Sequence, residues 1–264
     1  MYPEPLFYVY GTGITGYTLA FTGGVLPALF VLLFLGQERG LNLRAVLEAA
    51  VLSGGLALAV GSLLTLGLQW YIGDFPARWS LLFILMMVGS VLLYFWRMPA
   101  TRSHPGIGAD IFFPALALYL SIARIGCLMS GGAHGKPAWG VPWAIIADNP
   151  ASATAYRGIP IHPTQIYQIV ANLLVFIVLM ALRNRPGFQG RLVWVYLILY
   201  GIGRFVVEIY RGDPRPMAGP LSLNQIVCLL FIAVGVAGWR GWLPHSLWTG
   251  LGQRLRLIPH PVGS

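Results

Sequence analysis

Long apolar runs fill most of this chain and leave few charges to face water. Of its 264 residues, 57% are hydrophobic and only 9% are charged, whereas soluble domains carry about 25% charged residues. The apolar runs follow one another too closely to leave room for a soluble domain. The sequence therefore predicts a polytopic membrane protein that forms one membrane domain over residues 1–264.

Seven apolar segments are long enough to cross a bilayer, which takes about 20 residues for roughly 30 Å of hydrocarbon. We therefore expect an all-α fold with seven transmembrane helices. The first segment is overlong, and its N-terminal part, with Tyr8, Tyr10 and several glycines, is consistent with an arm in the membrane interface. The segments lie within residues 6–35 and at about 45–68, 79–96, 107–125, 164–182, 192–210 and 221–239.

Basic residues are unevenly divided between the two sides of the predicted bundle. Ten Lys and Arg fall on one side and five on the other, and cytoplasmic connections carry such an excess. We therefore expect an outside N-terminus, a cytoplasmic C-terminus and an outward-facing polar loop at about 127–163. The net charge of +9 is attributed to this orientation and to anionic lipids, so nucleic acid is not an expected partner.

A polar, glycine-rich segment between Arg124 and Tyr167 interrupts the apolar runs. Because hydrocarbon cannot solvate irregular backbone, this segment must lie at an interface or line a cavity within the protein, and either place can hold an active site. The two cysteines, Cys127 and Cys228, lie in different segments. Their spacing predicts neither a disulfide framework nor a metal site.

The predicted helix at 192–210 gives the strongest indication of a functional site. At about 100° per residue, spacings of four and three residues place polar and charged side chains on one stripe. These side chains are Tyr196, Tyr200, Arg204, Glu208 and Arg211. An unpaired arginine within the bilayer costs at least a few kcal/mol, so Arg204 requires partners, for which Glu208 and an anionic substrate are the candidates. A buried pair that only locks helices together is the alternative.

Arg124, at the outer end of the predicted helix at 107–125, favours the substrate interpretation. Two guanidiniums at similar depth have only Glu208 to offset them, and arginine binds phosphate groups bidentately. A phosphate-bearing ligand is therefore expected at Arg124 and Arg204. Near the other end of the same helix, Asp110 is expected to cap or position that helix.

Two histidines near these arginines are candidate bases. His162 precedes the predicted helix at 164–182, and its unperturbed pKa of about 6.5 suits proton removal near neutrality. The alternative, which we weigh equally, is a histidine that hydrogen-bonds the helix start and positions the loop. Gln165 and Tyr167 lie in the first turn of that helix. His134, among glycines in the loop, is the weaker candidate.

Taken in order, these motifs resemble the prolipoprotein diacylglyceryl transferases. The resemblance covers most of the chain but is dense only from Asp110 to Gln225, and it rests on Arg-Ile-Gly at 124–126, His-Pro-Thr-Gln-Ile-Tyr at 162–167 and Arg-Phe-Val-Val-Glu-Ile-Tyr-Arg at 204–211. It implies transfer of the diacylglyceryl group of phosphatidylglycerol to the lipobox cysteine of a prolipoprotein, with release of glycerol phosphate. It also implies a bacterial inner-membrane location and no metal or organic cofactor.

The resemblance also assigns site residues. Arg124 and Arg204 match the family's essential arginines, and its other matches in this chain are Tyr10-Gly11, Gly135, Tyr200, Glu208 and Gln225. We expect catalysis to involve Arg124, Arg204, His162 and Glu208. We expect the lipid and the signal-peptide region of the prolipoprotein to be bound by Tyr10, Gly135, His134, Gln165, Tyr167, Tyr200, Arg211 and Gln225.

The chain departs from the family pattern where the thiol would be activated. The family's His-Gly-Gly element has no histidine counterpart at 75–79, its Asn is Cys127, its acidic loop residue is Gly132, and its Glu after the His-Pro-Thr-Gln motif is Gln168. The phosphate-binding half of the pattern is retained, and the thiol-activating half is altered. Two alternatives follow: a lipid-binding or lipid-moving membrane protein that keeps the phosphate clamp without chemistry, and a purely structural membrane partner.

Overall fold

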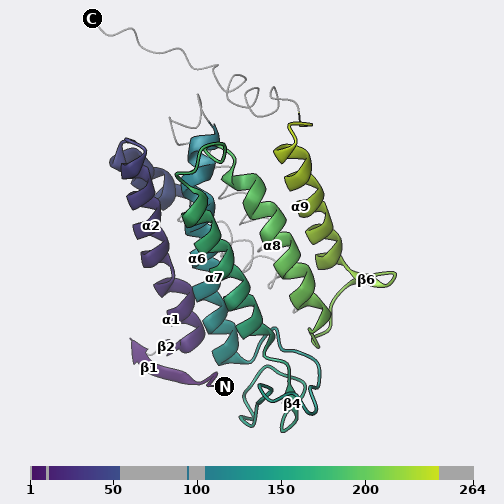
Figure 1. The fold of residues 1–264 in the computed structure, drawn as a ribbon. Helices are drawn as coiled ribbons and strands as arrows, with labels where there is room; N and C mark the ends of the chain where they lie inside the picture. Colours follow the sequence, from purple (N-terminus) through teal and green to yellow (C-terminus); the bar gives the residue numbers. More distant parts are fainter. Residues whose placement is uncertain (1, 10–11, 54–93, 95–104, 244–264) are drawn as a thin grey trace, which may run out of the picture.

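The computed structural model is a bundle of helices with loops and short strands at one end (Figure 1). It describes residues 2–9, 12–53, 94 and 105–243. The fold is mostly helical, and four helical stretches among the described residues are long and apolar enough to cross a membrane. These four are Gly16–Glu38, Gly106–Ser130, Thr164–Leu182 and Leu192–Ile209, and a shorter apolar helix spans Leu223–Trp239.

Four predicted helices coincide with observed ones. They are α6 (Pro105–Ser130), α7 (Thr164–Leu182), α8 (Leu192–Ile209) and α9 (Leu223–Trp239). The predicted span at 79–96 and most of the one at 45–68 lie outside the described residues. Seven spans and the direction of the termini therefore stay predictions.

The chain begins with a hairpin instead of a helix. β1 (Pro5–Val9) and β2 (Thr12–Thr15) pair antiparallel, and the helix that follows is divided into α1 (Gly16–Gly23) and α2 (Val25–Glu38). The Thr15 side chain accepts a hydrogen bond from the third residue beyond it and so begins α1. The first predicted span thus starts after this hairpin, which occupies the place of the expected interfacial arm.

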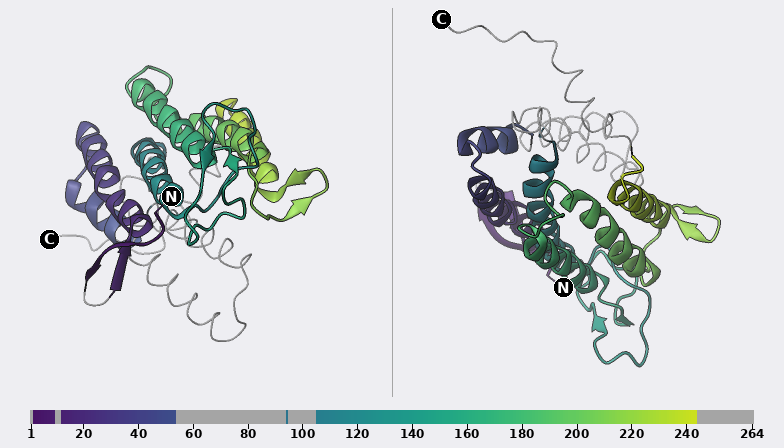
Figure 2. Two further views of the ribbon diagram at one scale, coloured as in Figure 1. Left: turned by 90° about the horizontal axis from the view of Figure 1, so that it is seen from below. Right: turned by 45° about the horizontal axis from the view of Figure 1, so that its top comes forward.

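Helix α6 lies at the centre of the described bundle. It packs against α1 and α2 on one side and against α7 and α8 on the other, while α9 packs on α8 (Figure 2). Small residues permit the close approach of α8 and α9, since a Cβ at Gly201 would lie 3.0 Å from the Cys228 carbonyl oxygen, and one at Gly235 would lie 3.0 Å from that of Trp194.

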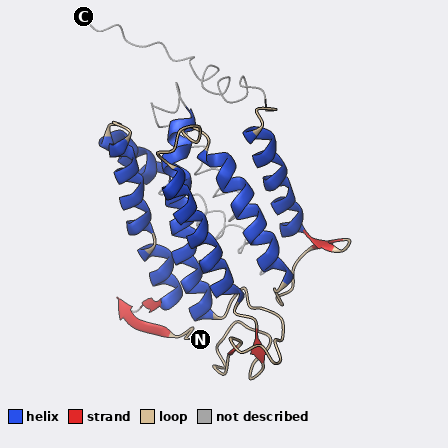
Figure 3. Ribbon diagram, in the orientation of Figure 1, coloured by secondary structure: helices blue, strands red, loops and turns tan. Residues whose placement is uncertain are grey.

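The strands of the described residues gather at one end of the bundle, which we call the loop end (Figure 3). In addition to β1 and β2, this end holds two short antiparallel pairs. They are β3 (Ile145–Ile146) with β4 (Pro160–Ile161), and β5 (Met217–Ala218) with β6 (Leu221–Ser222). The loop end is therefore built by the N-terminal hairpin and by the segments that follow α6 and α8.

At the opposite end of the bundle, Asp110 has a different task from the expected one. Its buried carboxylate accepts hydrogen bonds from the backbone N–H of Gly190 and, at 3.1 Å, from that of Leu192. Asp110 therefore caps the start of α8 and not its own helix, because unpaired N–H groups at a helix start attract a carboxylate. Arg39 lies 3.8 Å away and offsets the charge.

Candidate functional site

The charged stripe predicted for α8 converges on the carboxylate of Glu208. Its Oε2 lies 3.0 Å from Nη2 of Arg204 and 3.7 Å from Nη1 of Arg211. The Glu208 side chain has no exposed surface. A buried carboxylate requires compensation by positive charge and hydrogen bonds, and the helical spacing of four and three residues supplies both arginines.

Three further groups reach Glu208 that the sequence did not indicate. Nη1 of Arg215 lies 3.1 Å from Oε1, and Ser222 Oγ and Asn224 Nδ2 each donate to the same oxygen at 3.2 Å. Arg215 also donates to the backbone carbonyls of Glu208 and Arg211. The loop between α8 and α9 therefore folds back over the end of α8. In the sequence, the only indication of this arrangement is a basic residue, Arg215, seven positions after Glu208.

Arg204 is held on its other side by an uncharged group. Its Nη1 donates to Oε1 of Gln168 at 3.2 Å, and Nε2 of Gln168 donates to Oδ1 of Asn172 at 3.0 Å. Both amide side chains belong to the buried face of α7. Arg204 is 9% exposed. Gln168 thus fixes the orientation of its guanidinium without neutralising the positive charge, as a second carboxylate would.

Arg124 of α6 belongs to the same cluster. It is half-buried, and its guanidinium lies close enough to that of Arg204 for the two charges to repel. Its Nη1 is 3.9 Å from the sulfur of Cys127, and Cys127 lies within electrostatic range of Arg211. The charges of Arg124 on α6 and Arg204 on α8 therefore act on each other.

Arg211 is shared between Glu208 and Asp213. Its guanidinium donates two hydrogen bonds to the Asp213 carboxylate, one of them from Nε at 2.8 Å. Burial alone would raise the pKa of Asp213, but the hydrogen bond and charge of Arg211 outweigh burial, so the pKa of Asp213 lies below its ordinary value. Asp213 is therefore an anion that orients Arg211.

The described cluster carries more positive than negative charge. Three guanidiniums, those of Arg204, Arg211 and Arg215, contact the carboxylates of Glu208 and Asp213. A fourth, that of Arg124, lies close enough to Arg204 for the two charges to repel. Guanidiniums cannot lose their protons in a protein. The arrangement therefore favours an anion, and the planar, multiple donors of arginine suit phosphate oxygens.

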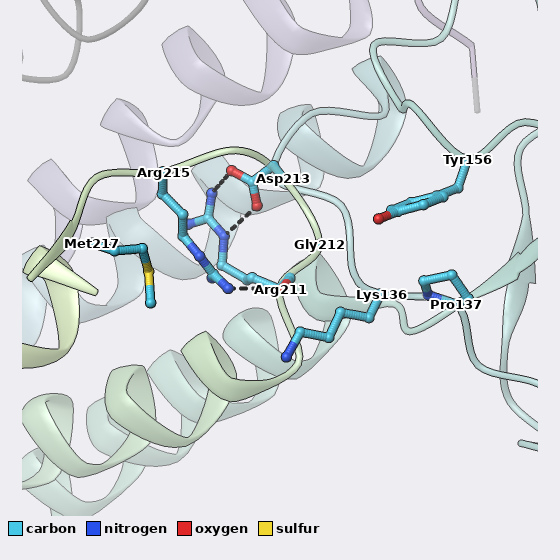
Figure 4. Close-up of a pocket in the computed structure, with 8 residues that line it drawn as sticks. All are labelled: Lys136, Pro137, Tyr156, Arg211, Gly212, Asp213, Arg215 and Met217. Carbon is cyan, nitrogen blue, oxygen red and sulfur yellow. Dashed lines mark hydrogen bonds and ion pairs between the residues drawn. The ribbon is translucent and has the colours of Figure 1, made fainter. Parts of the chain in front are cut away.

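A pocket of about 620 Å³ opens beside the cluster. Lys136 and Tyr156 project into it from one side, and Arg211, Asp213 and Arg215 line the other (Figure 4). The exposed Lys136 adds a further positive charge to the pocket. The cluster is thus continuous with a cationic opening at the loop end.

The glycine-rich loop is joined to the end of α8 by its backbone. Gly212 N–H donates to the His134 carbonyl at 3.0 Å, and Lys136 N–H donates to that of Tyr210 at 2.9 Å. A Cβ at Gly135 would lie 2.7 Å from that of His162. Gly135 therefore permits a close contact between the loop and His162, the residue two positions before α7, which a larger residue would force apart.

Both ring nitrogens of the buried His134 face backbone groups. Nε2 accepts from Ala155 N–H at 3.4 Å, so Nδ1 carries the hydrogen and donates to the Gly135 carbonyl at 3.3 Å. This arrangement uses both nitrogens within the loop. It fits a histidine that shapes the loop better than one that exchanges protons with a substrate.

His162 lies next to an aromatic chain at the start of α7. Its Nδ1 is 3.1 Å from the Tyr167 hydroxyl, which also accepts from Trp143 Nε1 at 2.7 Å, and the rings of His162 and Tyr210 are 5.0 Å apart. If Nδ1 donates to Tyr167, Nε2 is left as a proton acceptor. In that tautomer Nε2 of His162 can accept a proton, whereas both ring nitrogens of His134 already contact backbone groups.

The other predicted site residues are differently placed. Tyr200 is half-buried and stacks on Tyr196 with 5.3 Å between ring centroids. Gln225 forms a capping box with Ser222 at the start of α9, where its Oε1 accepts from Ser222 N–H at 3.0 Å. Tyr10 lies outside the described residues. Within the described part of the chain, no group of three metal-ligating side chains is present.

Comparison with known proteins gives one consistent result. The family model described as prolipoprotein diacylglyceryl transferase matches residues 82–240, more than half of the chain. A phosphatidylglycerol–prolipoprotein diacylglyceryl transferase of Clostridium tetani is 28% identical over 243 residues, which cover 88% of this chain and 94% of that protein. The protein of the same name from Synechocystis is 27% identical, covering 89% and 88%. The protein of the same name from Finegoldia magna is 38% identical over 128 residues, which cover 48% of this chain and 47% of that protein.

Proposed function

Because this chain belongs to the prolipoprotein diacylglyceryl transferase family, we propose that it moves the diacylglyceryl group of phosphatidylglycerol onto the cysteine thiol of a prolipoprotein. The observation that carries the proposal is the excess of positive charge in the cluster around Glu208, where Arg204, Arg211 and Arg215 contact two carboxylates and Arg124 lies near Arg204. That excess suits the phosphodiester of a phospholipid. An ion pair that only joins two helices would need no such excess of positive charge.

The proposed reaction is a displacement at carbon. The lipobox thiolate attacks the glyceryl carbon that bears the phosphate ester, a C–S bond forms, and the C–O bond breaks with its electron pair moving to the phosphate oxygen. Glycerol phosphate then leaves with one more negative charge than the lipid phosphate carried. Arg124 and Arg204 are proposed to stabilise this developing charge, because fixed cations in a buried site act where charge appears.

The thiol must lose its proton before it attacks. We propose His162 as the base, with Nε2 as the accepting atom and Tyr167 fixing the ring through Nδ1. The proton then passes to water. Glu208 and Asp213 are proposed to hold the arginines in place and not to touch the reacting atoms.

The location follows from the same family assignment. We propose that the bundle crosses the bacterial cytoplasmic membrane, with the loop end facing outward, where the signal-peptide region of a prolipoprotein would reach it. The excess of basic residues on the other side supports this orientation. The predicted seven spans are retained in this proposal.

The test combines purified protein, phosphatidylglycerol and a lipobox peptide, with release of glycerol phosphate as the readout. Arg124→Ala and Arg204→Ala should each abolish product, while Arg44→Ala, a matched change at an exposed position of the opposite end, should leave product unchanged. Tight lipid binding without product would instead support the lipid-binding alternative. Product that persists in both site variants would refute the proposed clamp.

A further inference from the structure

The buried face of α7 changes from polar to apolar along its length. Its buried residues are Thr164, Gln165, Gln168, Asn172, Val175 and Leu179. Spacings of three and four residues put Gln165, Gln168 and Asn172 on one stripe. Since Gln168 contacts Arg204, Gln165 lies on the same face one turn nearer the loop end.

The orientation of the Gln165 amide is fixed. Its Nε2 donates to the Gly132 carbonyl oxygen at 2.8 Å, and a carbonyl oxygen can only accept, so the nitrogen and not the oxygen must face it. The neighbouring Thr164 hydroxyl donates to the Ala133 carbonyl at 2.7 Å and holds the same loop. Turning the Gln165 amide over would break its bond to Gly132.

The other end of this amide has no partner among the residues that the structure describes. Oε1 of Gln165 is buried without a hydrogen bond, in a side chain that is 1% exposed. Most buried side-chain oxygens have a hydrogen-bond partner, and each exception in a native structure calls for an explanation, such as a bound water or ion or a role in catalysis. Oε1 is therefore an acceptor held ready for a donor.

The chemistry of an amide oxygen restricts that donor. It cannot bind the phosphate itself, whose oxygens are acceptors, and a thiol is a weak donor. A hydroxyl group is a strong donor, and the headgroup proposed for this site carries two hydroxyls on the three-carbon unit beyond its phosphate. Gln168 contacts Arg204, and Gln165 lies about one helical turn, or about 5 Å, further along α7. If Arg204 binds the phosphate, this distance matches the reach of the three-carbon unit from the phosphate to Gln165.

We propose that Gln165 Oε1 accepts a hydrogen bond from a headgroup hydroxyl and so makes the site selective for hydroxylated headgroups. This inference rests on the proposed function for the identity of the lipid. Arg124 and Arg204 would then recognise the phosphate that all anionic phospholipids share, and Gln165 would recognise what lies beyond it. Gln165 is a specificity-determining residue in this account.

The test measures binding and needs no turnover. Phosphatidylglycerol and phosphatidylpropanol, which has the same phosphodiester and no headgroup hydroxyl, each displace a fluorescent phosphatidylglycerol from the detergent-solubilised full chain. Wild type should prefer phosphatidylglycerol by about 3- to 10-fold, the range of one neutral hydrogen bond. Gln165→Met should bind both lipids equally. Gln37→Met, the same change at an exposed position of α2, should keep the preference.

An unchanged preference in Gln165→Met would overturn the inference. If that variant also binds the lipobox peptide more weakly, Oε1 would be assigned to a peptide N–H instead. If Gln165→Met does not fold, wild type alone still tests the inference, because equal binding of phosphatidylglycerol and phosphatidylpropanol would overturn it. A preference without any product in wild type would refute the transferase and leave the selectivity intact.

Discussion

The two ends of the bundle each hold a cluster of arginines and carboxylates, and the clusters differ in their charge balance. At the opposite end, Arg183 binds Glu38 through Nε and Nη2 at 3.0 and 3.1 Å, and Arg39 lies 3.8 Å from Asp110. These two cations face two anions. At the loop end, three guanidiniums contact two carboxylates, and a fourth, that of Arg124, lies near Arg204. Balanced charge joins helices, whereas unbalanced charge leaves capacity for a ligand.

The partners of the charges differ as well. Both carboxylate oxygens of Asp110 accept hydrogen bonds from backbone N–H groups, those of Gly190 and Leu192, which are fixed parts of the fold. Arg204 is held by the uncharged Gln168 and lies close to another cation, Arg124. Repulsion between two neighbouring cations costs stability, and a bound anion would relieve it. The comparison predicts that changes to the loop-end arginines chiefly affect activity, whereas changes to the ion pairs of the opposite end chiefly affect stability.

Arg204→Lys should give the largest effect. Lysine keeps the charge but loses the planar donors that grip a phosphate and reach Gln168 and Glu208 together. We expect kcat/KM to fall about 100- to 1000-fold, the range for removal of one fixed donor to a developing oxyanion, with little change in Tm. Arg183→Lys is the matched control and should leave kcat/KM near wild type. Equal losses in both variants would contradict the comparison.

His162→Ala extends the test to an uncharged group of the loop end. If His162 accepts the thiol proton, kcat should fall about 100-fold while the affinity for phosphatidylglycerol stays within a factor of two or three of wild type. Tyr167→Phe, which removes the bond to Nδ1, should lower kcat less. Activity assays with varied lipid and peptide separate the two constants. Loss of kcat and lipid affinity to the same extent would assign His162 to positioning.

Asp110→Ala should show the reverse pattern at the opposite end. It leaves the N–H groups of Gly190 and Leu192 and the charge of Arg39 without their buried partner. The expected cost is about 3 kcal/mol of unfolding free energy, measured as a lower midpoint in denaturation followed by circular dichroism. Glu38→Ala breaks a partly exposed pair and should cost about 0.5 kcal/mol. Under conditions in which both variants are still folded, short of the denaturation midpoint of each, they should keep the kcat of wild type.

Sequence patterns gave the helices of the bundle more readily than its loops. The α7 bounds of 164–182 were predicted correctly, because Pro163 and Arg183 flank a mostly apolar run that contains no charged residue. The stripe of α8 followed from helical spacing alone. The N-terminal hairpin was not predicted, because its strands directly precede the apolar residues of α1 and α2 and were included in the overlong first segment as an interfacial arm.

Contacts between segments distant in sequence could not be predicted in this way. Asp110 was assigned to its own helix because a cap is ordinarily local, yet it serves a helix start 80 residues away. Arg215 lies beyond the end of α8, where helical spacing no longer applies, and it reaches Glu208 only because the chain turns back. Asn224 approaches the same carboxylate from α9. Such partners depend on how the helices pack.

Asp213→Asn should give the smallest effect, and pH can identify its origin. Arg211 holds the pKa of Asp213 below its ordinary value despite burial, so the folded state binds this proton less readily than the unfolded state. The stabilisation is therefore complete above the unfolded pKa of about 3.9 and is lost as pH falls through the lower folded pKa. We expect Asp213→Asn to cost about 1 kcal/mol near pH 7, and the difference in Tm from wild type should shrink only below about pH 4. Asp148→Asn, a matched change at an exposed position, should show no such trend. A difference that stays constant to pH 3 would mean that Asp213 acts through packing and not through its charge on Arg211.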